Sequence, residues 1–221
     1  TAEARERAQG RPWSFLHISK PEIDLPEGTD PYAPEVYAKA RENFEHMLGE
    51  GVLRRDPEPY YYLYRLVMGT HEQIGLVAAA SVPDYDSNRI RKHEFTRPDK
   101  EDDRVRQVDA LNAQTGPVFL TYRHNSTIDT LVATVTAEAP EVDVTADDGV
   151  RHSLWVVRDS AQIDTITRTF DAMACLYIAD GHHRSAAASR VAAQRKAANP
   201  NHTGDEAYNY FLSVIFPDNQ M

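Results

Sequence analysis

The sequence predicts a mixed α+β domain. Its apolar runs and amphipathic stretches follow one another irregularly, in the order hairpin, helix, strand, helix, two strands, helix, strand, helix, strand. A regular doubly wound sheet would instead alternate strands and helices one by one. The hydrophobic fraction of 41% is ordinary for a globular protein. We therefore expect residues 1–221 to form a single mixed α/β domain.

The first third of the chain predicts a strand, a helix and a hairpin. Residues 13–18 are apolar and aromatic, which favours a strand. The helix expected at 34–49 has Pro34 at its first position and Gly49 as its stop signal, with one apolar face directed to the core. Residues 60–68 and 73–82 have strand propensity and flank a turn at 69–72, so they predict the hairpin.

The rest of the chain predicts helices and strands in mixed order. A charged stretch leads into a helix that reaches about Gln114, with Thr96 or Asp99 as its cap. Cys175 is interpreted as a small core residue of a strand. Further strands are expected at 118–122, 142–145, 150–157, 176–178 and 210–216, and further helices at 127–138, 160–172 and from His182 onward.

Composition excludes several classes of protein. The net charge of -10 argues against nucleic acid or an anionic membrane as the main partner. A single cysteine rules out an internal disulfide framework and a Cys-rich zinc site. Since no apolar stretch could span a bilayer and no signal peptide is visible, a cytoplasmic protein is expected.

The first candidate site is a polar turn between a short strand and an Ala-rich helix. Gly181 allows the backbone to reverse there, and the free N–H groups at the start of the helix can bind an anion. Clustered ionisable groups at a turn indicate function more than structure. The turn carries Asp180, Gly181, His182, His183, Arg184 and Ser185.

A second polar cluster lies about ninety residues earlier in the chain. A charged loop before a capped helix explains its acidic residues at 101–103. That reading does not explain the residues just ahead of and within the helix start, which are Lys92, His93, Glu94, Thr96, Lys100 and Arg104.

The motifs present favour a polyphosphate ligand, with the metal left undetermined. The sequence has no nucleotide-binding glycine motif of the two common types and no zinc-protease or hydrolase motif. Adjacent His182 and His183 would point about 100° apart on a helix, which does not suit one metal ion. Gly181, Arg184 and Ser185 are predicted to hold phosphates, with Lys92, His93, Thr96, Lys100 and Arg104. Asp180, His182, His183 and Glu94 are the acid–base or Mg²⁺ candidates.

The stretch Asp180-Gly181-His182-His183-Arg184 resembles the signature turn of the ParB/sulfiredoxin-like superfamily. In that fold a Gly-x-x-Arg segment opens a helix and binds nucleotide phosphates, which implies the same fold here. Sulfiredoxins carry a reactive cysteine in this turn, whereas this chain has His182, which argues against sulfinic-acid repair. No helix-turn-helix module like that of the partition proteins follows.

A longer resemblance, over nearly the whole chain, is to the prokaryotic domain-of-unknown-function family 1015. It rests on four stretches: 21–26 (PEIDLP), 92–104, 116–119 (GPVF) and 179–184 (ADGHHR). Members of that family are longer, with an extra N-terminal strand region and a C-terminal half. The resemblance therefore implies that residues 1–221 are a fragment, and it supports a functional 92–104 cluster.

These observations predict an enzyme that binds a nucleotide or a phosphorylated metabolite, with Mg²⁺ and ATP or ADP as candidate cofactors. The expected reaction is phosphoryl transfer or hydrolysis, and the similarity to free-serine kinases allows a small hydroxyl acceptor. The alternative is a binding module that a nucleotide switches without turnover. A purely structural role for the two clusters, as internal ion pairs, is the third possibility.

Overall fold

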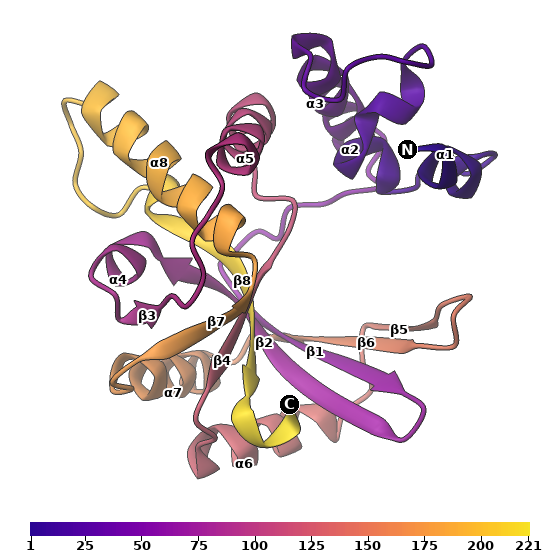
Figure 1. Ribbon diagram of the computed structural model, residues 1–221. Coiled ribbons are helices and arrows are strands. Elements are labelled where there is room, and N and C mark those ends of the chain that lie inside the picture. Colours follow the sequence, from indigo (N-terminus) through magenta and orange to yellow (C-terminus); the bar gives the residue numbers. More distant parts are fainter.

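The computed structural model describes residues 1–221 and is built on one eight-stranded sheet (Figure 1). The strand order is β3-β7-β4-β8-β2-β1-β6-β5. The strands are β1 (Tyr61–Met68), β2 (His71–Ser81), β3 (Ile90–Arg91), β4 (Val118–Tyr122), β5 (Val142–Thr145), β6 (Arg151–Val157), β7 (Leu176–Asp180) and β8 (Tyr210–Pro217).

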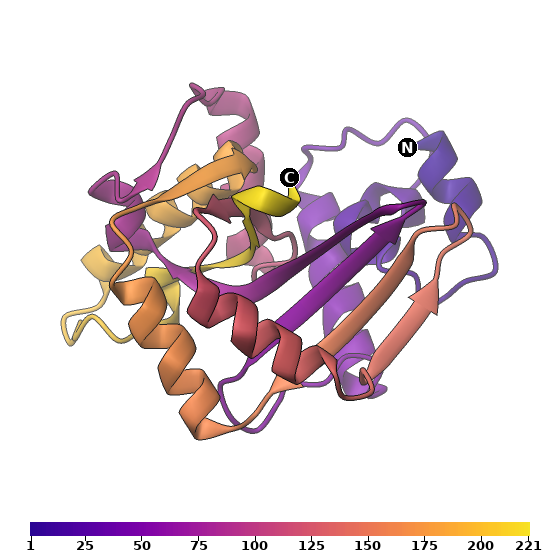
Figure 2. The same ribbon diagram turned by 90° about the horizontal axis from the view of Figure 1, so that it is seen from below.

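Helices lie on both sides of this sheet, as Figures 1 and 2 show, with α5 and α8 on one side and α6 and α7 on the other. This confirms the predicted mixed α+β class. The α-helices are α1 (Ala2–Ala8), α2 (Leu16–Ser19), α3 (Pro34–Gly49), α4 (Val82–Asp86), α5 (Pro98–Leu111), α6 (Ser126–Thr136), α7 (Ser160–Asp171) and α8 (His182–Ala198). Three short 3₁₀ helices, η1 (Pro21–Asp24), η2 (Ala207–Asn209) and η3 (Asp218–Gln220), complete the chain.

The sheet is mixed, and its main core lies between the strands and the helices. Most neighbouring strands are antiparallel, but β3 runs parallel to β7, and β4 runs parallel to β8. The centre of the core is almost completely closed to solvent, as Leu63, Leu120, Ile178 and Phe211 are each at most 1% exposed. Burial of such side chains supplies the main favourable term in folding.

The N-terminal helices α1, α2, η1 and α3 form a small helical unit that packs on α5 rather than on the sheet. Its own core joins Ile18, Ala40 and Met47 to Leu111 of α5. Gln107 of α5 adds a buried hydrogen bond, because its side-chain amide donates to the Ile18 carbonyl at 3.0 Å. The apolar face predicted for the helix at 34–49 is confirmed by this core.

The strand predicted at 13–18 is wrong. Residues Leu16–Ser19 form the short helix α2, and the backbone N–H of Leu16 donates to the hydroxyl of Ser14 at 3.3 Å. The physical reason is that this segment packs against helices and not against a sheet. Ile18 is fully buried among helices, and no sheet edge lies alongside to supply the backbone hydrogen bonds that a strand needs.

Several predicted boundaries also move. The hairpin turn is narrower than 69–72, because β2 already begins at His71. Helix α5 begins at Pro98 after Arg97, with no capping side chain from Thr96 or Asp99, and it ends at Leu111 before Asn112 in the left-handed conformation. Cys175 precedes β7 and is only partly buried, so it is not a core strand residue.

Candidate functional site

The parallel pairing of β3 and β7 brings the two polar clusters together. Ile90 pairs with Leu176 and Arg91 with Tyr177, so both strands end at the same edge of the sheet. The chain leaving β3 becomes the loop 92–97, and the chain leaving β7 becomes the turn at Gly181. Segments about ninety residues apart in sequence therefore meet where the two strands end.

The turn between β7 and α8 depends on a glycine. Gly181 has φ +97°, in the region that favours glycine, and it directly precedes the first residue of α8. A Cβ at this position would lie 3.2 Å from the Cα of Val118 and 3.1 Å from Nη1 of Arg184. Backbone conformation and close approach to β4 thus both disfavour a side chain here.

Helices α5 and α8 lie side by side and run in the same direction (Figure 1). Their contacts advance along both helices together, from Arg97–His183 through Asp102–Arg190 to Asp109–Arg195. Both N-termini therefore open at the Gly181 turn. The positive ends of two helix dipoles meet there, which favours an anion. At the start of α5 the backbone donors already have partners, because Pro98 has no N–H and the Arg97 N–H donates to His183.

His182 is the buried centre of this site. The residue is 3% exposed, and its Nε2 has no hydrogen-bond partner, while its Nδ1 lies 3.5 Å from a carboxylate oxygen of Glu94. The ring of His93 stands edge-on to it, with ring centroids 4.5 Å apart. Burial lowers the pKa of His182, and the neighbouring His93 lowers it further, although Glu94 acts in the opposite direction. The neutral imidazole is therefore favoured.

His183 fastens the loop 92–97 to the start of α8. The backbone N–H of Arg97, the residue before α5, donates to Nε2 of His183 at 3.1 Å. Because Nε2 accepts this bond, the proton of a neutral His183 ring sits on Nδ1. The two adjacent histidines thus have different surroundings: one ring is buried beside Glu94, and the other bridges two helix starts.

Arg184 reaches across to a segment that the sequence analysis did not assign to the site. Its Nη1 donates to the Pro117 carbonyl and lies 3.7 Å from the exposed carboxylate of Asp180. A Cβ at Gly116 would lie 3.5 Å from the Arg184 side chain, an ordinary van der Waals distance, so Gly116 and Arg184 are direct neighbours. In the sequence, the Gly116-Pro117 pair marks only a turn before β4. The pairing of β4 with β7 is what brings this turn next to Arg184.

The remaining predicted phosphate-binding residues do not all converge on the turn. The Ser185 hydroxyl is fully buried and donates to the His182 carbonyl at 3.1 Å. The Thr96 hydroxyl donates to Glu101. The Nζ of Lys92 lies 3.9 Å from the centre of the Tyr85 ring and makes a cation–π contact with it. The Lys92 ammonium is therefore directed to α4.

Lys100 and Arg104 lie on another face of α5. The Nζ of Lys100 donates to the Tyr32 hydroxyl at 3.3 Å, so it faces the N-terminal unit. Arg104 pairs with its neighbour Asp103, which also accepts from the Tyr37 hydroxyl at 2.9 Å. Residues four apart share one helix face, and here that face is not the one against α8. The predicted ligand roles of both residues stay predictions.

The site offers carboxylates but no complete metal cage. No group of three or more histidine, cysteine, aspartate or glutamate side chains is arranged to hold a metal ion. Asp180 and Glu94 could each supply one oxygen. That number suits Mg²⁺ only together with oxygens from a bound phosphate, since Mg²⁺ often uses one or two protein carboxylates.

The fold and this site define a mixed α/β protein with a cluster of polar side chains at the start of two parallel helices. The chain belongs to the family described as "Protein of unknown function (DUF1015)", whose model matches residues 1–221. Neither a curated protein nor a solved structure matches it. No helix of the structure is both long and apolar enough to cross a membrane.

Proposed function

We propose that the loop 92–97 and the Gly181 turn form a binding site for the phosphate groups of a nucleotide or phosphorylated metabolite. The observation that carries this proposal is the joint start of α5 and α8, linked by the Arg97 N–H bond to His183. Two helix N-termini beside one guanidinium suit an anion, even on a chain whose net charge is -10. The resemblance of the turn to the ParB/sulfiredoxin-like superfamily supports the same assignment.

The proposed reaction is phosphoryl transfer to a hydroxyl, or hydrolysis. An acceptor oxygen forms a bond to phosphorus as the bond from phosphorus to the leaving phosphate oxygen breaks. Glu94 accepts the proton of the attacking oxygen, because its carboxylate is exposed while His182 lies behind it. Arg184 and the helix starts stabilise the transferred charge, and Asp180 can hold Mg²⁺ that arrives with the phosphates. Ser185 keeps the first turn of α8 in place.

A ligand screen tests the proposal. Melting temperature is measured with ATP, ADP, CTP, GTP and pyrophosphate, each with and without Mg²⁺. A ligand at about a hundred times its Kd stabilises the fold by roughly 2.7 kcal/mol. The shift should disappear in Arg184→Ala and persist in Arg168→Ala, a matched exposed arginine on α7, on the other side of the sheet.

Three outcomes are distinguishable. A shift in wild type that Arg184→Ala removes supports the phosphate site, and phosphate release then separates an enzyme from a nucleotide-switched module. A shift that both variants keep contradicts the role of Arg184. No shift with any of the five ligands contradicts the proposal.

A further inference from the structure

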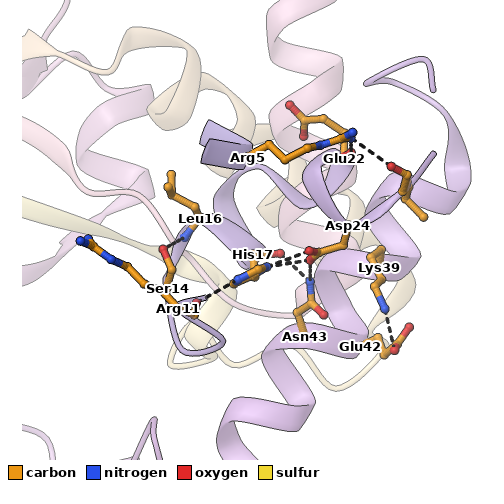
Figure 3. Close-up of polar contacts among 11 residues, drawn as sticks. Arg5, Arg11, Ser14, Leu16, His17, Glu22, Asp24, Lys39, Glu42 and Asn43 are labelled. Carbon is orange, nitrogen blue, oxygen red and sulfur yellow. Dashed lines mark hydrogen bonds and ion pairs between the residues drawn. The ribbon is translucent and has the colours of Figure 1, made fainter. Parts of the chain in front are cut away.

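Two cavities of the protein differ in the side chains that line them. The larger one, of about 880 Å³, lies in the N-terminal helical unit and is lined mostly by polar residues. Its polar groups already bond within the unit, since Arg5 donates to the Glu22 carbonyl at 3.2 Å and Nδ1 of His17 lies 2.9 Å from Asp24 (Figure 3). The smaller one, of about 300 Å³, lies between α7 and the sheet, and eleven of its sixteen lining residues are hydrophobic. We propose that this second cavity, the α7 cavity, binds an uncharged aromatic molecule of about two fused rings.

The α7 cavity exists because β2 carries small side chains opposite α7. Leu76, Ala78 and Ala80 alternate along β2 and therefore share one face of the strand, and all three line the cavity. Two of these three positions thus present only a methyl group. Protein interiors contain few voids larger than a water molecule. A space of about 300 Å³ that the chain's own side chains leave unfilled is therefore room for a ligand.

The lining is largely sealed from water and partly aromatic. Ile90, Ile166 and Ile215 line the cavity and are each at most 4% exposed. Tyr61 and Phe170 also line it, and both pack against the main hydrophobic core. Aromatic rings favour offset or edge-on contact with another ring. Apolar walls with two aromatic side chains therefore suit an aromatic ligand.

The charged groups of the lining are already paired, which selects an uncharged ligand. The guanidinium of Arg89 donates to the carboxylate of Asp84 at 2.9 Å and to the carbonyl of Phe170 at 3.0 Å. The hydroxyls of Tyr61 and Thr167 bond to each other at 2.9 Å. An ionised ligand would enter apolar walls without a free opposite charge beside it, and burying an unpaired charge is costly. A neutral ring meets no such penalty.

The volume sets the size of the ligand. An apolar cavity of about 150 Å³ holds one benzene ring, so about 300 Å³ has room for two fused rings. Tyr210 lines the cavity and is 37% exposed, so it marks the side from which a ligand can enter. The cavity includes Ile90 and Leu176 at the starts of β3 and β7, whereas the Gly181 turn follows the end of β7. This inference is therefore independent of the phosphate site.

Calorimetric titration with indole, a neutral bicyclic ring, tests this inference. We expect saturable one-to-one binding in wild type. Ala78→Leu fills the α7 cavity and should weaken the binding of indole by about tenfold or more, while it raises the melting temperature of the free protein because it buries more apolar surface. Ala79→Leu is the matched control. The Ala79 side chain is exposed on the opposite face of β2, so this change should alter Kd by less than about twofold.

Other results would overturn the inference. Absence of saturable binding would exclude the site, and unchanged or equal Kd values in Ala78→Leu and Ala79→Leu would place indole outside the α7 cavity. Indole-3-carboxylate, which carries a negative charge, should bind about tenfold more weakly than indole, and equal binding would contradict the selection for a neutral ring. If Ala78→Leu does not fold, Ala80→Val decides, because it adds two methyl groups to the same face. It should weaken binding by about threefold, and no weakening relative to Ala79→Leu contradicts the proposal.

Discussion

Replacing Gly181 with alanine should destabilise the protein more than the same change at any open turn. The residue has φ +97°, which costs a non-glycine residue about 1–2 kcal/mol. The new Cβ would also lie 3.2 Å from the Cα of Val118, a backbone atom of β4 that cannot rotate away. Overpacking of this kind adds about 1–2 kcal/mol. We therefore expect Gly181→Ala to lower the free energy of unfolding by about 2–4 kcal/mol.

Gly149 provides the matched control. It has φ +82°, but a Cβ there would meet nothing within 4 Å. Gly149→Ala therefore carries only the backbone term, of about 1–2 kcal/mol. Urea unfolding followed by circular dichroism gives both values, and an unchanged m-value shows that only stability has changed.

The difference between the two variants measures the contact with β4. Equal losses in Gly181→Ala and Gly149→Ala would refute the close approach of the turn to Val118. If that approach is real, Gly181→Ala should also weaken any ligand of the turn, because the first N–H groups of α8 shift with it.

Two further predictions concern the pH response and a helix cap. Burial lowers the pKa of His182 in the folded state, so the unfolded chain binds the proton first as pH falls. The free energy of unfolding should therefore decrease below about pH 6.5, and His182→Gln should flatten this limb in urea titrations from about pH 8 to 5; an unchanged limb would assign it to other groups. Asn125 caps α6 by accepting from the backbone N–H of Thr127 at 2.9 Å. Asn125→Ala should cost about 1 kcal/mol in the same assay, and Asn125→Asp much less; equal losses would mean that the cap contributes nothing.

The sequence predicted the bounds of helices and strands best where local residue preferences alone determine them. The helix at 34–49, the strands at 142–145 and 118–122 and the start of α8 at His182 were all predicted within a residue or two. Pro34, Gly49 and an apolar face marked the first helix, Gly181 marked the start of α8, and strand propensity marked the two strands. Residues 13–18 had aromatic strand-like character, yet they form a helix because only helices surround Ile18.

The candidate site was predictable in its polar residues but not in its geometry. The sequence identified the 92–104 and 180–185 clusters as functional candidates. It could not show that Lys100 and Arg104 face Tyr32 and the N-terminal unit, that Ser185 is buried, or that Gly116 and Pro117 receive Arg184. Those facts depend on which helix face packs against which neighbour.

The sequence by itself determined the class of fold, the glycine turn and the polar residues that follow it. These depend on local preferences: hydrophobic periodicity, strand propensity and the freedom of glycine at positive φ. The tertiary structure alone decided that β3 lies parallel to β7 and that α5 and α8 start at one point. Strand pairing and helix packing join residues far apart in the chain, and their outcome depends on the sum of many weak contacts that no short stretch contains.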